Sequence, residues 1–182
     1  MHPALQHVGH RTEPLPMRPW ALSMEWHDLV MLHWPIAPEL LQRQLPKGLQ
    51  IETYDGAAWL GVVPFVMRHV RPRWLPPAPG AANFPELNLR TYVTYQGIPG
   101  VWFFSLDAAS KLAVRGARLG FGLPYFDAQM RCEHTGSQVC YASQRTHRGA
   151  PPAVLEARWI APRDFAAPAR GTIARSEEHT SE

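Results

Sequence analysis

The sequence predicts a mainly β protein of the α+β class, an antiparallel β-barrel or cone with two short helices. Three observations predict it. Stretches rich in β-branched and aromatic residues recur along the chain, with hairpin signals at Asp55-Gly56, at residues 96–100 and at Thr135-Gly136. Only two segments show helical spacing of apolar residues. The 182 residues, 46% of them hydrophobic, are enough for one domain with a sizeable core.

The first elements are strands that surround one short helix. Residues 24–34 alternate between two faces, which suits a strand. Residues 38–45 read as a helix, because a proline opens it, a glutamate lies in its first turn and a Pro-Lys-Gly sequence ends it. Residues 49–54 and 57–67 are predicted strands joined by the turn at Asp55-Gly56.

The middle of the chain combines a loop with a second strand pair. Residues 71–85 contain five prolines, so they cannot form a central strand and we expect a long loop there. Residues 87–95 and 100–106 are strongly β-prone and are predicted to form a hairpin.

The last part begins with the second helix. Small and apolar residues recur at helical spacing after Asp107, which is the predicted N-cap, and the glycines and proline of residues 120–124 end the helix. Residues 125–134, 138–147 and 154–160 are predicted strands. The total is seven or eight strands with two helices.

Composition and motifs exclude several classes of function. We find no apolar run long enough for a membrane span and no secretory signal, and two cysteines favour the reducing cytoplasm. The net charge is +3 with scattered arginines, so we expect no nucleic-acid partner. The motifs of triad hydrolases, phosphate-binding loops and dinucleotide-binding folds are absent from the sequence, and we expect no cofactor. The sequence leaves open whether the protein forms a homo-oligomer.

We divide the chain into three parts. Residues 1–19 are polar and proline-rich, and we interpret them as a flexible N-terminal arm. Residues 20–174 form a single domain that we expect to be incomplete at its C-terminus. Residues 175–182, Arg-Ser-Glu-Glu-His-Thr-Ser-Glu, resemble the translated start of a sequencing-adapter oligonucleotide, and we interpret them as an artefact.

The most informative candidate site is a polar row on one predicted strand. Glu86, Asn88 and Arg90 follow each other at every second position, so they project from one face. A carboxyl group, an amide and a guanidinium in a row can orient a small polar ligand. The alternative is a solvated row, or one whose members bond only to each other. The preceding proline-rich loop, placed as a lid over a pocket would be, favours the ligand.

The second predicted helix carries a basic stripe. Lys111, Arg115 and Arg118 stand at helical spacing on one face. A lysine beside two cations is one known form of nucleophilic amine, and the alternative is a solvated helix face. Cys132, His134 and Cys140 have neither the spacing nor the number of ligands of a zinc site, so we expect free thiols and no metal site.

Four stretches resemble the YqjF-like family, a bacterial domain of unknown function grouped with acetoacetate decarboxylase-like folds. They are residues 57–65 (AAWLGVVPF), 84–93 (FPELNLRTYV), 103–108 (FFSLDA) and 117–125 (ARLGFGLPY). The resemblance implies a barrel or cone with a small-molecule cavity. It also implies a missing catalytic group, because Tyr125 and Phe126 stand about where those decarboxylases have their lysines.

Three hypotheses follow. The first is a protein that binds a small carboxylate or carbonyl compound in a barrel cavity, with Arg90 or Arg118 as the anchor and with Glu86 and Asn88 in the polar wall. The second is an enzyme acting on keto compounds, through Lys111 or through an acid–base pair of Glu86 and Tyr125. The third is an interaction module that uses the exposed proline-rich loop 71–85. The sequence leaves open whether the protein is an enzyme.

Overall fold

The computed structural model describes residues 19–160. The predictions of an arm over residues 1–19 and of an artefact over residues 175–182 therefore fall, except for Pro19, outside the described residues. Helices and strands have the following bounds: β1 Leu22–His27, β2 Leu32–Ile36, α1 Pro38–Gln42, β3 Leu49–Ile51, β4 Thr53–Tyr54, β5 Ala57–Pro72, β6 Phe84–Tyr95, β7 Ile98–Ala108, α2 Lys111–Phe121, β8 Tyr125–Thr135, β9 Gln138–Arg145 and β10 Val154–Ile160.

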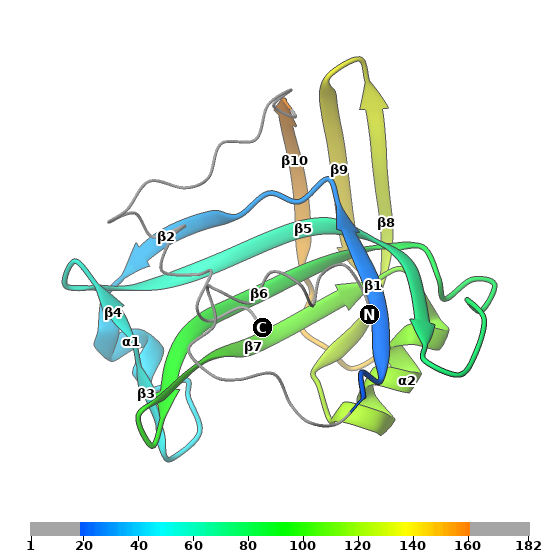
Figure 1. Cartoon of the computed structure of the whole chain (residues 1–182). Coiled ribbons are helices and arrows are strands. Elements are labelled where there is room, and N and C mark those ends of the chain that lie inside the picture. Colours follow the sequence, from blue (N-terminus) through cyan, green and yellow to red (C-terminus); the bar gives the residue numbers. More distant parts are fainter. Residues whose placement is uncertain (1–18, 161–182) are drawn as a thin grey trace.

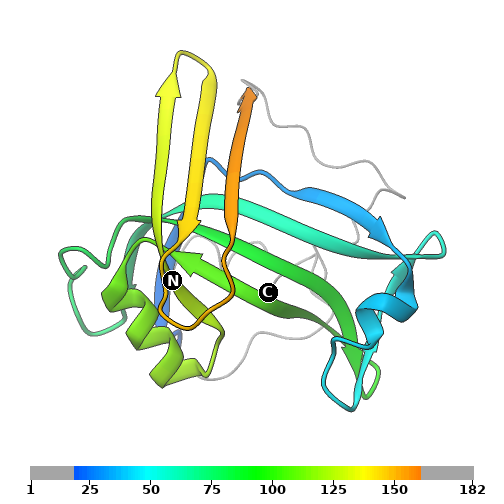
Figure 2. The same ribbon diagram turned by 180° about the vertical axis from the view of Figure 1, so that it is seen from behind.

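The described strands form one sheet that curls into a half barrel (Figure 1). β1, β5, β6, β7, β8, β9 and β10 lie side by side in that order, β2 and β4 pair with β5, and β3 pairs with β6. The hairpin β8–β9 and β10 rise from one end of the curled part, as Figure 2 shows from behind. The predicted β-rich class with two helices is confirmed, although the structure has ten strands.

One strand pair departs from the antiparallel pattern. β7 and β8 run parallel, and they pair only over Leu106–Ala108 and Tyr125–Asp127. α2 connects them, because parallel neighbours need a crossover. The turn between β4 and β5 is as predicted: Asp55 and Gly56 both have positive φ, of 54° and 76°, which suits a tight turn. The turn between β6 and β7 is shorter than the expected residues 96–100, because it consists of Gln96 and Gly97 alone.

Three predicted boundaries are wrong, and all depend on pairing with other strands. The single strand expected over residues 49–54 is divided into β3, which pairs with β6, and β4, which pairs with β5. The expected single strand over residues 24–34 is broken at Asp28, whose φ of 54° turns the chain so that β1 and β2 pair with different stretches of β5. The loop expected over residues 71–85 is shorter at both ends. Pro72 still pairs with Leu22 in β1, and Pro85 pairs with Val66 near the start of β6, where a proline is tolerated.

The N-cap prediction for α2 is also wrong. Asp107 is still part of β7, and Arg145 donates to both of its carboxylate oxygens at 2.7 and 3.1 Å. The cap is Ser110, whose hydroxyl accepts from the backbone N–H of Ala113 at 3.2 Å and donates to the carbonyl of Gly80 at 2.6 Å. Ser110 therefore joins the start of α2 to the loop after β5.

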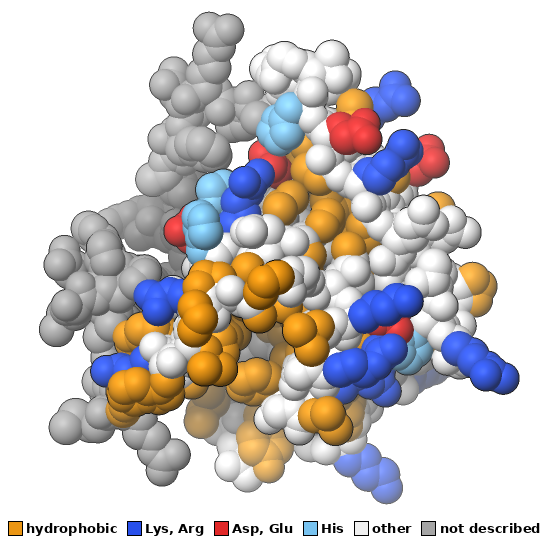
Figure 3. Space-filling view, turned by 90° about the vertical axis from the view of Figure 1, so that its right-hand side faces the viewer, with side chains coloured by type: hydrophobic (Ala, Val, Ile, Leu, Met, Phe, Trp, Pro, Cys, Tyr) orange, Lys and Arg blue, Asp and Glu red, His pale blue; other side chains and the backbone are white. Residues whose placement is uncertain are grey.

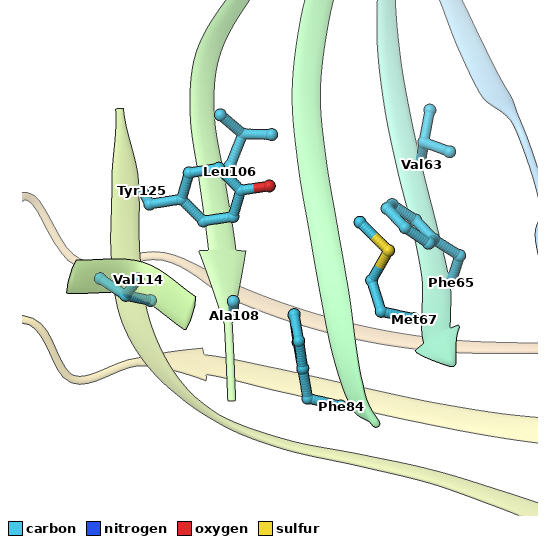
Figure 4. Packing of buried hydrophobic residues seen from close by; sticks show 8 residues of the cluster. All are labelled: Val63, Phe65, Met67, Phe84, Leu106, Ala108, Val114 and Tyr125. Atoms are coloured by element: carbon cyan, nitrogen blue, oxygen red, sulfur yellow. The ribbon is translucent and has the colours of Figure 1, made fainter. Parts of the chain in front are cut away.

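The core lies where the inward faces of β5, β6 and β7 meet α2 and the start of β8 (Figure 4). Its buried members are Val63, Phe65, Met67, Phe84, Leu106, Ala108, Val114 and Tyr125. Complete burial of one of the larger apolar side chains contributes about 1.5–3 kcal/mol. Within residues 19–160 no helix has the length and apolar character that crossing a bilayer requires.

The serine cap gives a first prediction. Ser110→Ala removes two hydrogen bonds at a site that is 5% exposed, so we expect the free energy of unfolding to fall by about 1–3 kcal/mol. Urea denaturation measures it. Ser137→Ala, in the exposed turn between β8 and β9, serves as the matched control and should change the value by less than about 0.5 kcal/mol. Equal effects of the two substitutions would contradict the assignment of the cap.

Candidate functional site

The polar row of β6 is buried. Glu86, Asn88 and Arg90 are 1%, 4% and 2% exposed, so a solvated row is excluded. The register of the sheet explains this burial, because Glu86 lies opposite Phe65 and Asn88 lies opposite Val63, two members of the core. The three polar side chains thus project into the interior of the half barrel.

Glu86 is the centre of the row. The hydroxyl of Tyr125 donates to its Oε1 at 3.0 Å. Burial raises the pKa of Glu86 from 4.5 to about 8, although the Tyr125 hydrogen bond acts in the opposite direction. The carboxyl group is therefore mostly protonated at neutral pH. Burial, and next to it the neighbouring Glu86, raise the pKa of Tyr125, which keeps its hydroxyl a donor.

β9 supplies a second tyrosine that the sequence did not single out. The hydroxyl of Tyr141 donates to the backbone carbonyl of Glu86 at 2.7 Å and lies 3.3 Å from the carbonyl of Phe65. Burial raises the pKa of Tyr141 as well. Ser143 follows two positions later on the same face of β9 and is 3% exposed. Val139, Tyr141 and Ser143 are buried at every second position, and this alternation identifies the inward face of β9.

Three buried oxygens of this region have no hydrogen-bond partner among the described residues. They are Glu86 Oε2, Asn88 Oδ1 and Ser143 Oγ. A buried polar atom without a partner costs about 1–3 kcal/mol, so natural proteins satisfy nearly all of them. Buried hydrogen-bonding groups without a partner among the described residues therefore lie on both β6 and β9.

Arg90 lies at the other end of the row, beside β2. Its guanidinium donates to the hydroxyl of Tyr92 at 3.3 Å, and His33 Nε2 lies 2.8 Å from the same hydroxyl. Gly61 makes room for both groups. A Cβ there would stand 3.2 Å from His33 Nε2 and 3.3 Å from Cγ of Arg90, which is tighter than most real contacts. Space, and not backbone conformation, selects glycine at this position.

The basic stripe of α2 does not act as one group. Arg115 binds both carboxylate oxygens of Asp127, at 3.0 and 2.9 Å. Arg118 donates to the backbone carbonyl of Tyr125 at 2.8 Å, so it contacts the site through the backbone. Lys111 is exposed at the first position of the helix.

Two surface hollows lie away from the row of β6. One of about 320 Å³ is on the face of β8–β10 that carries Arg131, Glu133 and Arg158, and one of about 470 Å³ runs beside Val101–Phe104. Neither is lined by the row of β6. Figure 3 shows the side of the molecule that carries α2, where Lys and Arg side chains stand in several separate groups among hydrophobic ones.

Comparison with known sequences gives a family and one curated relative. Residues 23–179 match DUF2071, described as an uncharacterized conserved protein. The chain is 49% identical over 126 residues to the uncharacterized protein YqjF of Bacillus subtilis (strain 168). The match covers 69% of this chain and 52% of that protein, so the chain spans about half the length of its curated relative.

Comparison with solved structures gives the fold. MppR, an enzyme of enduracididine biosynthesis, is similar with a TM-score of 0.54 and 18% identity, covering 85% of this chain and 60% of the other. The acetoacetate decarboxylase of Legionella pneumophila has a TM-score of 0.50 and 14% identity, covering 78% and 58%. The fold is therefore of the acetoacetate decarboxylase-like type, as the sequence predicted.

The buried carboxyl group predicts a pH dependence of stability. The folded protein retains the Glu86 proton up to about pH 8, whereas a carboxyl group of ordinary pKa loses it near pH 4.5. Because the folded state then binds more protons than the unfolded chain, the free energy of unfolding falls as the pH rises through this window, by at most about 1.4 kcal/mol per pH unit.

Glu86→Gln removes this titration and keeps an acceptor for Tyr125. We expect the variant to gain stability over the wild type as the pH rises from about 4.5 to about 8, with no further change above that range. Urea denaturation at a series of pH values measures the difference. Glu133→Gln on the exposed part of β8 is the control and should follow the wild type. Parallel curves for wild type and Glu86→Gln would show that Glu86 ionises normally.

Proposed function

We propose that this chain, which belongs to the DUF2071 family, binds a small carboxylate or carbonyl compound on the inward faces of β6 and β9. One observation carries the proposal: Glu86 Oε2, Asn88 Oδ1 and Ser143 Oγ are buried and have no partner among the described residues. Since an unsatisfied buried group is costly, a ligand that bonds to these atoms gains the free energy that the folded protein alone does not recover.

The chemistry of the row suits an oxygen-bearing ligand. Tyr125 occupies Oε1 of Glu86, which leaves the acid proton of Glu86 for Oε2. A neutral carboxyl group then donates to a ligand oxygen, and Asn88 accepts from a hydroxyl or amine group of the ligand. Arg90 adds a positive charge beside them, which favours an anion. A similar fold, that of MppR, has been solved with the condensation product of pyruvate and imidazole 4-carboxaldehyde.

A second candidate function is acid–base catalysis on a keto compound by Glu86 and Tyr125. The observation in its favour is the 3.0 Å hydrogen bond between them, together with a pKa of Glu86 of about 8, near the working pH of most enzymes. We also propose a cytoplasmic location, since both cysteines are free thiols. Docking through the proline-rich loop, where Trp74 is 82% exposed, stays a prediction.

Replacement of Asn88 tests the binding proposal. Asn88→Leu keeps the branched shape of the side chain but removes the unsatisfied acceptor, so we expect unchanged or increased stability and at least about tenfold weaker binding. Lactate and 3-hydroxybutyrate, which carry a carboxylate and a hydroxyl group that can donate to Asn88 Oδ1, are the probes, and ligand-observed NMR with the full chain gives the dissociation constants. Gln144→Leu, an exposed amide on β9, is the matched control. Binding that survives in Asn88→Leu, or no binding of any probe by the wild type, would refute the proposal.

Trapping with borohydride separates binding from Schiff-base chemistry. Lys47 and Lys111, the two lysines of the chain, are both exposed and no hydrogen bond links them to Glu86. We therefore expect no stable adduct by intact mass after incubation with pyruvate and borohydride. An adduct that is lost in Lys111→Ala would establish a working amine and would favour a decarboxylase- or aldolase-like reaction instead.

A further inference from the structure

Three metal-ligating side chains meet at the tip of the hairpin β8–β9, away from the row of β6. They are Asp28, Cys132 and His134, and one ligand atom of each lies within 4.8 Å of the other two. His134 Nε2 is 3.1 Å from a carboxylate oxygen of Asp28. The sequence did not predict this group, because Asp28 is more than one hundred positions away from the other two along the chain.

The fold explains why the three groups converge. Cys132 and His134 are two positions apart on β8, so they share a face. That face points inward, since Cys132 lies opposite the buried Tyr141 in the register of the hairpin. Asp28 stands at the break between β1 and β2, where its φ of 54° turns the chain. Aspartate tolerates this left-handed conformation better than most residues do.

We propose that Asp28, Cys132 and His134 form a binding site for a divalent transition-metal ion of the Zn²⁺ type. The donor set is one carboxylate oxygen, one thiolate sulfur and one imidazole nitrogen, and each is a common ligand of zinc. Three protein ligands leave the fourth tetrahedral position to water. An ion can reach the site from solvent on the side of His134, whose side chain is 49% exposed. Asp28, whose side chain is 16% exposed, lies on the more buried side.

The spacing of the ligand atoms is close to what such an ion needs. Zinc binds nitrogen and oxygen at about 2.0–2.2 Å and sulfur at about 2.3 Å, so ligand atoms at a tetrahedral ion are somewhat closer together than 4.8 Å. Asp28 and His134, whose ligand atoms are 3.1 Å apart, are already that close. Without metal, the 3.1 Å contact between His134 Nε2 and the carboxylate of Asp28 links the end of the hairpin to the chain between β1 and β2. An ion would take over this link and add Cys132 to it.

Binding of the ion requires the thiolate form of Cys132. Zinc binds the thiolate, so uptake of the ion breaks the S–H bond and releases that proton to solvent. The apparent affinity therefore increases with pH.

Titration of the reduced full chain with Co²⁺ tests the site, since this ion occupies zinc sites and gives a thiolate-to-cobalt charge-transfer band. We expect the band in the wild type and its loss in Cys132→Ser. Asp28→Asn and His134→Gln should weaken cobalt binding at least about tenfold, because even second-shell changes at metal sites cost that much. Zn²⁺ should displace cobalt and raise the melting temperature of the wild type but not of Cys132→Ser.

Cys140→Ser is the matched control. Cys140 is the other half-buried free thiol and lies on the opposite face of the hairpin, so its replacement should leave the band unchanged. The charge-transfer band reports sulfur ligation only, so histidines elsewhere in the sequence do not produce it. No band in the wild type, or equal loss of the band in Cys132→Ser and Cys140→Ser, would overturn the proposal. If Cys132→Ser does not fold, the weaker cobalt binding expected for His134→Gln, at an exposed position, tests the proposal in its place.

Discussion

The hydroxyl groups of Tyr125 and Tyr141, which both donate to Glu86 of β6, stabilise the junction between the hairpin β8–β9 and the rest of the sheet. β8 joins the rest of the sheet through three residue pairs of parallel ladder. Tyr125 and Tyr141 strengthen this junction by donating to the carboxyl group and to the backbone carbonyl of Glu86. Glu86 is buried and mostly protonated at neutral pH. Tyr125 bonds to only one of its two carboxyl oxygens, so the other oxygen remains a polar group in the interior of the half barrel.

Local patterns were sufficient to predict much of this fold. The alternation along residues 84–92 placed Glu86, Asn88 and Arg90 on one face, and the hairpin turns followed from their glycines. Prediction from local sequence failed where the structure depends on pairing between residues that are far apart in the chain. The break at Asp28 exists because β1 and β2 pair with different parts of β5, and Asp107 cannot cap α2 because Arg145 holds it in β7.

The site was predictable only in part for the same reason. Period-two spacing shows that three polar residues share a face, but burial of that face depends on partners from other strands. Tyr141 lies 55 positions from Glu86, and the sequence gives no sign that its hydroxyl reaches that carbonyl. The stripe on α2 was placed on the correct helix, yet helical spacing does not reveal that Arg115 and Arg118 are each used by a different part of β8.

The short ladder between β7 and β8 has a consequence for the order of folding. Among residues 19–160, β8, β9 and β10 pair only with their neighbours in sequence, so this meander closes short loops at little cost in chain entropy. β1 must instead pair with the end of β5, from His27 with Val66 to Leu22 with Pro72, which closes a much longer loop. The meander is therefore expected to form early and to dock late, with the tyrosine hydroxyls reaching Glu86 only after the folding barrier. Interactions made at that stage mainly govern how slowly the native protein unfolds.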